Sequence, residues 1–130
     1  MSPVIPGISK ELALTYDQAL ARVPEVLASE GFGVLTEIDV SATLAKKLGV
    51  AFRRYKILGA CNPTLAHKAL GIALEIGVML PCNVIVYEHD KNGATIVAVD
   101  PAETMAARDP QLAELAADVR QRLVRVIEQV

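Results

Sequence analysis

The sequence is short of the residues on which many specialised functions depend. It has no tryptophan, three tyrosines and two phenylalanines in 130 residues. Proteins that bind single-stranded nucleic acid stack bases on aromatic side chains, so this scarcity argues against such a surface. A net charge of −2, from 13 basic and 15 acidic residues, gives no general attraction for nucleic acid or anionic lipid. We therefore expect no nucleic-acid partner.

Long hydrophobic runs are also missing. A transmembrane helix needs about 20 consecutive apolar residues, and no run in this chain approaches that length. Residues 1–7 have neither a basic segment nor a following apolar one, so we expect no signal peptide. The sequence predicts a cytoplasmic protein with no membrane partner. In that compartment its two cysteines, Cys61 and Cys82, are expected to be reduced thiols and not a structural disulfide.

Apolar residues, in contrast, are abundant. They make up 52% of the chain, while prolines and glycines are scattered and form no linker. A chain of this length buries roughly two-thirds of its unfolded surface. We expect one domain over residues 1–130.

Four helices are predicted from capping signals and from apolar residues at helical spacing. Thr15 and Gln18 form a capping box before a helix that ends near Gly31, with a kink or restart expected at Pro24. Ser41 is expected to cap a helix over residues 42–48, and a further helix covers about 63–76. Asp109 precedes a C-terminal helix of about 20 residues.

The strands lie between these helices. Alternating or continuous apolar patterns predict strands over residues 32–40, 50–60, 78–87 and 95–99, the third interrupted at Pro81. Asn92-Gly93 indicates a tight hairpin turn before the last strand. A strand-rich centre with helical ends predicts an α+β fold, a two-layer sandwich with a mainly antiparallel sheet backed by helices, including the long C-terminal one.

A Cys-Asn pair occurs twice, each time beside a proline. In the first, Asn62 is a favourable N-cap and Pro63 suits the first helical position, so Cys61 lies near the positive end of a helix dipole. That position favours a thiolate, which makes Cys61 a candidate reactive thiol or ligand contact. The alternative is a small buried cysteine that fills a strand-to-helix corner.

The second pair, Cys82-Asn83, follows Pro81 within an apolar strand. Because proline cannot donate to a β ladder, an edge, bulge or bend is expected there, and bulges often lie beside active sites. The two pairs can meet only if their strands run antiparallel, which the sequence does not decide.

Other polar residues give weaker signals. His67 lies one turn into the helix that begins after Cys61, which brings it within possible reach of the thiol. The chain has no C-x-x-C or closely spaced histidine pair, so we expect no metal site. Asp100, before Pro101, is either a turn starter or a carboxylate at a ligand pocket. No cofactor and no reaction follow from these residues.

Several segments together resemble the signature of the family known as domain of unknown function 302. They are residues 31–39 (GFGVLTEID), 55–63 (YKILGACNP), 76–88 (IGVMLPCNVIVYE) and Asp100-Pro101. The resemblance covers roughly residues 10–107 and implies a compact bacterial or archaeal α+β domain that forms a homodimer. It implies no activity. Its signature residues here are Cys61, Asn62, Pro63, Pro81, Cys82, Asn83, Asp100 and Pro101.

Three functions fit these observations. The leading one is a domain that binds a small ligand near Cys61, Asn62, Cys82 and Asn83. The second is a thiol-based redox or sulfur-handling protein that uses Cys61 or Cys82. The third is a structural homodimeric scaffold in which the motifs serve backbone geometry.

Overall fold

The structure is a computed structural model, and it describes residues 7–90, 92–104 and 109–130. A five-stranded sheet forms its centre, with neighbouring strands antiparallel in the order β1-β5-β4-β3-β2. The strands are β1 (Gly7–Leu12), β2 (Gly33–Asp39), β3 (Tyr55–Cys61), β4 (Cys82–Glu88) and β5 (Ala94–Val99). The helices are α1 (Tyr16–Ser29), α2 (Val40–Leu48), α3 (Pro63–Ile72), α4 (Pro101–Thr104) and α5 (Pro110–Gln129), with a 3₁₀ helix η1 over Leu74–Met79.

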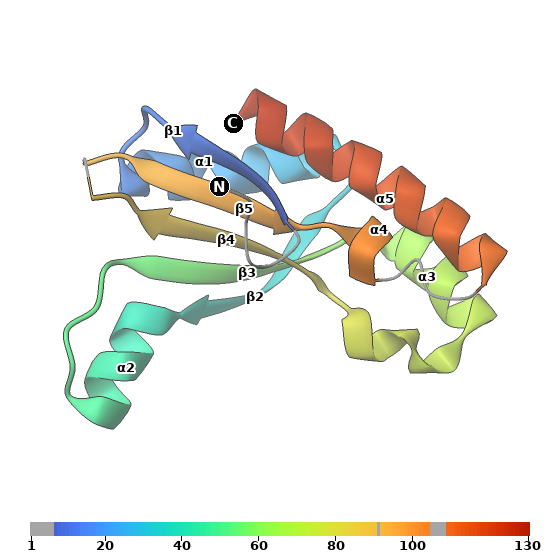
Figure 1. Ribbon diagram of the computed structural model, residues 1–130, viewed down its shortest axis with the longest axis horizontal. Coiled ribbons are helices and arrows are strands. Elements are labelled where there is room, and N and C mark those ends of the chain that lie inside the picture. Colours follow the sequence, from blue (N-terminus) through green and yellow to red (C-terminus); the bar gives the residue numbers. More distant parts are fainter. Residues whose placement is uncertain (1–6, 91, 105–108) are drawn as a thin grey trace.

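Helices α1 and α5 cover one face of the sheet, which gives the fold two layers (Figure 1). The core lies between them, and the strand residues that point into it alternate along each strand. They include Leu58, Val84, Val86, Ile96 and Ala98, all nearly or fully buried. On the opposite face, which we call the outer face, several apolar side chains are only half-buried; they include Ile57, Ile85 and Val97. The predicted α+β fold with a mainly antiparallel sheet is confirmed.

Helix α5 begins and packs as its sequence indicates. The Asp109 carboxylate accepts hydrogen bonds from the backbone N–H groups of Gln111 and Leu112, at 2.7 and 3.2 Å. Its buried residues recur every three or four positions and form a stripe that packs against α3 and η1 at its start and against the sheet and α1 further on: Leu112, Ala116, Val119, Leu123, Val126 and Ile127. In the described part of the chain, no helix combines the length and apolar character that a membrane crossing requires.

Helix α1 starts with the predicted capping box, in which Thr15 Oγ1 accepts from the Gln18 N–H and Gln18 Oε1 accepts from the Thr15 N–H. The expected restart at Pro24 is wrong, because the helix is continuous through that residue. Proline removes one backbone hydrogen bond, but Val23 and Leu27 on either side are fully buried and hold the helix against the core.

The strand predicted over residues 78–87 is wrong at its start. Residues 78 and 79 belong to η1, and β4 begins only at Cys82. Pro81 has no N–H to donate, so the ladder cannot extend back through it. The helix predicted over 63–76 ends at Ile72 because Ala73 is extended, and η1 then turns Ile76 into a small second core with Ala69.

Other boundaries also differ. The strand predicted over residues 50–60 begins at Tyr55. The cap of α2 is Asp39 and not Ser41, because the Asp39 carboxylate accepts from both the Ala42 N–H and the Ser41 hydroxyl, each at 2.9 Å. The sequence did not reveal β1 or the single-turn α4. The hairpin between β4 and β5 is confirmed, and Asn92 adopts a positive φ of 64°.

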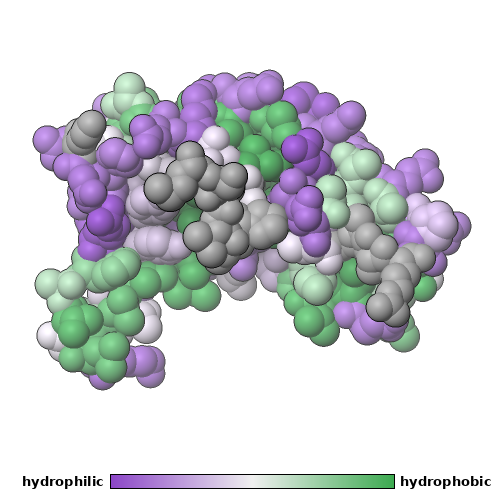
Figure 2. Space-filling model, viewed as in Figure 1, coloured by the Kyte–Doolittle hydropathy of each residue, from purple (hydrophilic) through white to green (hydrophobic). Residues whose placement is uncertain are grey.

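Helix α2 projects from the body of the domain (Figure 1), and none of its residues is buried. We call the segment 40–52 the arm. Exposed large apolar side chains gather on the arm and on β2 before it, and Figure 2 shows hydrophobic residues over α2 at lower left. They are Leu35, Ile38, Leu48, Val50 and Phe52.

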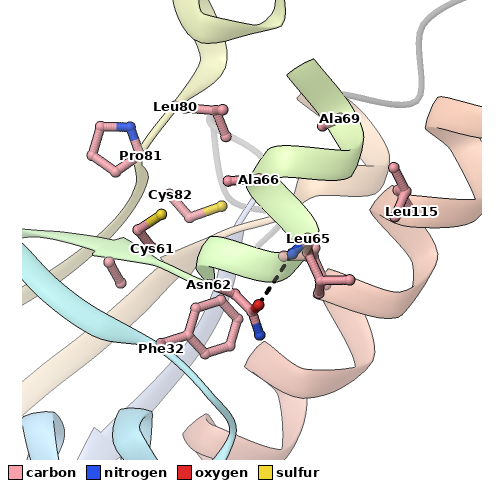
Figure 3. A pocket seen from close by; sticks show the side chains of 12 residues that line it. Phe32, Cys61, Asn62, Leu65, Ala66, Ala69, Leu80, Pro81, Cys82 and Leu115 are labelled. Carbon is pink, nitrogen blue, oxygen red and sulfur yellow. Dashed lines mark hydrogen bonds between the residues drawn. The ribbon is translucent and has the colours of Figure 1, made fainter. Parts of the chain in front are cut away.

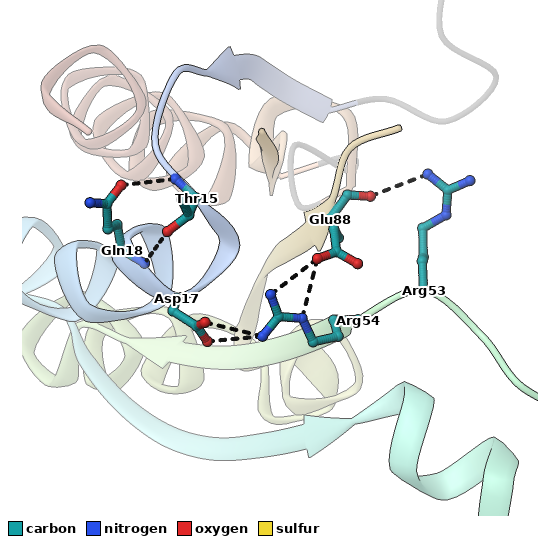
Figure 4. A network of polar contacts seen from close by, with 6 residues as sticks. All are labelled: Thr15, Asp17, Gln18, Arg53, Arg54 and Glu88. Atoms are coloured by element: carbon teal, nitrogen blue, oxygen red, sulfur yellow. Dashed lines mark hydrogen bonds and ion pairs between the residues drawn. The ribbon is translucent and has the colours of Figure 1, made fainter. Parts of the chain in front are cut away.

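Arg54 fixes the point where the arm rejoins the sheet. Its guanidinium donates to both carboxylate oxygens of Asp17 at 3.1 Å and to Glu88 Oε2 at 3.0 and 3.3 Å (Figure 4). It also lies 4.6 Å from the centre of the Tyr16 ring. These contacts tie the return of the arm to α1 and β4.

Candidate functional site

The antiparallel pairing of β3 with β4 brings the two Cys-Asn motifs to the same end of the sheet. Ala60 lies opposite Cys82 and Gly59 lies opposite Asn83. Cys61 is therefore one residue beyond the register partner of Cys82. Paired Cα atoms in an antiparallel ladder are about 4.5–5.5 Å apart, so the two cysteines are close neighbours across the strands.

The first motif starts α3. Asn62 Oδ1 accepts a hydrogen bond from the Leu65 N–H at 3.2 Å, and Pro63 is the first helical residue. Gly31, with φ of 86°, makes room for this cap, because a Cβ there would lie 2.9 Å from Asn62 Nδ2. The amide of Asn62 thus acts on the backbone, and Cys61 is half-buried just before the start of the helix.

The two side chains of the second motif lie on opposite faces of the sheet. Successive side chains of a strand point in opposite directions, so Cys82 points into the core while Asn83 is exposed on the outer face. Burial, and to a smaller extent the neighbouring Cys61, raise the pKa of the Cys82 thiol from 9.0 to about 11. Cys82 is therefore a neutral thiol at physiological pH when no other partner is present.

Both thiols line one pocket, which we call the thiol pocket. It lies between the ends of β3 and β4 and the helices α3 and α5, and Figure 3 shows the two sulfur atoms on the same side of it. Its other walls are mainly apolar and include Phe32, Leu65, Leu80, Leu115 and Val119. The volume of the pocket is about 20 Å³, which is enough to hold about one water molecule.

Gly59 and Pro81 shape the sheet beside the pocket. A Cβ on Gly59 would collide with Thr36 Oγ1 and would lie 2.8 Å from Pro81 Cγ. The glycine therefore lets the proline ring and the threonine of β2 approach the strand from the outer face. The Leu80–Pro81 peptide bond is cis. The next residue, Cys82, is the first of β4 and points into the core.

The other candidate residues lie elsewhere. Asn83 lines a separate hollow of about 260 Å³ on the outer face, with Val99 and Thr104. His67 is exposed on α3 and is not part of the lining of the thiol pocket. Asp100 accepts from Arg120 Nε at 3.1 Å and from the Ala102 N–H at 3.0 Å, so it joins α4 to α5.

The structure also adds residues that the sequence did not single out. Phe32, Leu80 and Leu115 form walls of the thiol pocket. The sequence could have identified Leu65 and Leu115 as buried residues, since each belongs to the apolar stripe of a predicted helix. Three or more His, Cys, Asp or Glu side chains do not come together as a metal site anywhere in the described residues. The pocket therefore offers two sulfur atoms and few other polar groups.

Comparison with known proteins identifies the family of this chain. The family model described as "Domain of unknown function DUF302" matches residues 8–130. A crystal structure of an uncharacterised conserved DUF302 protein from Bacillus stearothermophilus superimposes with a TM-score of 0.87. It is 31% identical, and the alignment covers 95% of this chain and 96% of that one. No curated protein matches the sequence. This chain therefore belongs to the DUF302 family, whose function is unknown.

Proposed function

We propose that this protein binds a small ligand in the thiol pocket and holds it through Cys61 and Cys82 together. The observation that carries the proposal is that both thiols line one mainly apolar pocket. A cytoplasmic location is part of the proposal, because thiols stay reduced in that compartment.

The hydrogen bonds near the pocket favour sulfur as the binding group. Asn62 lines the pocket, but its amide oxygen already accepts the hydrogen bond that caps α3. Asn83 is on the outer face of the sheet. The two asparagines that the sequence suggested as orienting groups therefore lie at different places, whereas the two cysteines line the same pocket.

The volume of the pocket favours an occupant of one or a few atoms. Pockets for drug-sized molecules measure about 300–1,000 Å³, and the thiol pocket measures about 20 Å³. A ligand of that small size gains little from apolar contact alone, so direct bonds to sulfur would supply most of its affinity. This supports the thiol-based function over the binding of a larger organic molecule.

A trivalent arsenical tests the proposal because it bonds to two neighbouring thiols at once. Monomethylarsonous acid, CH₃As(OH)₂, reacts with two S–H groups to form two As–S bonds and release two water molecules. We expect one adduct per chain in intact mass spectra, lost in Cys61→Ala and in Cys82→Ala. His67→Ala is the matched control and should keep the adduct. If the wild-type protein forms no stable adduct, the two thiols do not act together and the proposal is wrong.

A second proposal concerns assembly. We infer that a second copy of this chain covers the arm and that the protein is a homodimer. The supporting observation is that α2 has no buried residue, while Ile38 on β2 and Leu48 and Phe52 on the arm are exposed. Exposed apolar side chains that gather in one part of a molecule mark interaction sites, and a two-fold axis would let each arm pack on the sheet of the other copy.

Light scattering after size-exclusion chromatography tests the dimer. The wild-type protein should elute as a dimer, and Ile38→Glu with Phe52→Glu should produce a folded monomer. Leu74→Glu, at an exposed apolar residue of η1, is the control and should leave the dimer unchanged. A monomeric wild-type protein, or a variant with both glutamates that stays dimeric, would show that the arm and the end of β2 do not form the interface.

A further inference from the structure

We propose that Cys61 and Cys82 form a two-coordinate site for a soft monovalent metal ion, Cu(I). This inference rests on the proposed function, because it names the occupant of the thiol pocket. Its starting point is that two sulfur atoms lie on one side of a pocket of about 20 Å³, which suits an occupant the size of a single ion (Figure 3).

The set of donor atoms selects the ion. Structural zinc takes four ligands in tetrahedral geometry, and calcium and magnesium take six or more oxygen atoms. The described residues bring no group of three or more His, Cys, Asp or Glu side chains together. Two thiolates suit Cu(I), which is soft and accepts linear coordination by two sulfur atoms. His67 is exposed and outside the lining, so it does not supply a third donor.

The binding step balances without an oxidant. Two S–H bonds break, two S–Cu bonds form, and two protons leave to solvent, so that the bound unit carries one negative charge. The start of α3 lies directly beside this charge, since Cys61 immediately precedes the Asn62 cap. The positive end of a helix dipole, equivalent to roughly half an elementary charge, stabilises an anion at that place.

The walls of the pocket suit a reduced metal. Leu65, Leu80 and Leu115 line the pocket beside the sulfur atoms, and Cys82 is buried. Limited access of water disfavours further oxygen ligands, which Cu(II) prefers. An apolar surround of this kind therefore favours the monovalent state of copper.

Anaerobic competition with the chromophoric ligand bicinchoninate measures the affinity. Reduced wild-type protein should remove one Cu(I) per chain from the dye complex. Cys61→Ala and Cys82→Ala should each lose more than the roughly 10–100-fold that removal of an outer-shell partner costs a metal site. His67→Ala should bind as the wild type does, and Zn²⁺ in excess should not displace the Cu(I).

X-ray absorption of the wild-type protein loaded with Cu(I) tests the inference without requiring any variant to fold. Two sulfur neighbours and no nitrogen or oxygen neighbour are expected. A nitrogen neighbour, binding of Cu(I) that survives Cys82→Ala, or no competition with the dye would each overturn the inference. If the arsenical adduct forms but Cu(I) does not bind, the two-thiol function stands and only the choice of ion is wrong. If neither binds, both proposals fall together.

Discussion

The close approach of Pro81 and Thr36 to Gly59 leads to a quantitative prediction for Gly59→Ala. The added methyl group would overlap Thr36 Oγ1 and would lie 2.8 Å from Pro81 Cγ, whereas carbon atoms in contact prefer about 3.5–4.0 Å. Overpacking of this kind costs about 1–3 kcal/mol. Replacing glycine by alanine recovers about 0.4–1 kcal/mol from the lower entropy of the unfolded chain. We expect a net loss of about 1–2 kcal/mol in the free energy of unfolding.

Thermal and urea unfolding followed by circular dichroism measure this loss. For a chain of this length, the expected decrease in Tm is about 3–5 °C for each kcal/mol. Gly33→Ala, also in the β2–β3 pair, is the matched control, since a Cβ there meets nothing within 4 Å. The double variant Thr36→Ala, Gly59→Ala should lose less than the sum of the two single variants. If Gly59→Ala is as stable as Gly33→Ala, the steric account is refuted.

Three further predictions concern the motifs and the ion pairs. Asn62→Ala should lower the free energy of unfolding by about 0.5–2 kcal/mol because it removes a helix cap, whereas Asn83→Ala, on the exposed outer face, should change it little; urea unfolding compares the two. Burial raises the pKa of the Cys82 thiol from 9.0 to about 11, so the folded state keeps a proton that the unfolded chain loses, and stability should fall as pH rises from 9.0 to about 11. Cys82→Ala should lack this fall in denaturant titrations at several pH values. The hydrogen bond from Arg125 lowers the pKa of Glu30 below 4.5, so the contribution of this pair should be present above pH 4.5 and disappear as pH falls through the lowered pKa. Proton titration of Glu30 by NMR should show the lowered pKa, and Arg125→Gln should raise it.

Much of the fold could be predicted because its signals are local. The capping residues Thr15, Asn62 and Asp109 each act on a backbone N–H two or three positions along the chain, so a short stretch of sequence contains all the information. In contrast, β1 pairs with β5 across most of the chain, and its polar sequence gives no alternation strong enough to identify it alone.

The candidate site was predicted only in part, for a geometric reason. The two Cys-Asn pairs suggest one cluster of four side chains, but neighbouring residues of a strand point to opposite faces. This alternation turns Cys82 inward and Asn83 outward. In the first pair, Asn62 lies beyond the end of β3, so it escapes the alternation and caps α3. The register of β3 with β4 brings the two cysteines to the same end of the sheet, and the lining of the thiol pocket shows that both reach it.

The positions of the two thiols along the chain have a mechanical consequence. Cys61 and Cys82 flank residues 62–81, which contain α3 and η1. Any ligand that bonds both sulfur atoms therefore closes this segment into a loop. By the entropy relation used for disulfides, a covalent link around a loop of this length disfavours the unfolded chain by roughly 3 kcal/mol. A ligand bonded to both thiols would in this way restrain α3. The rate at which the amide hydrogens of this helix exchange with solvent would therefore show whether the thiols are joined.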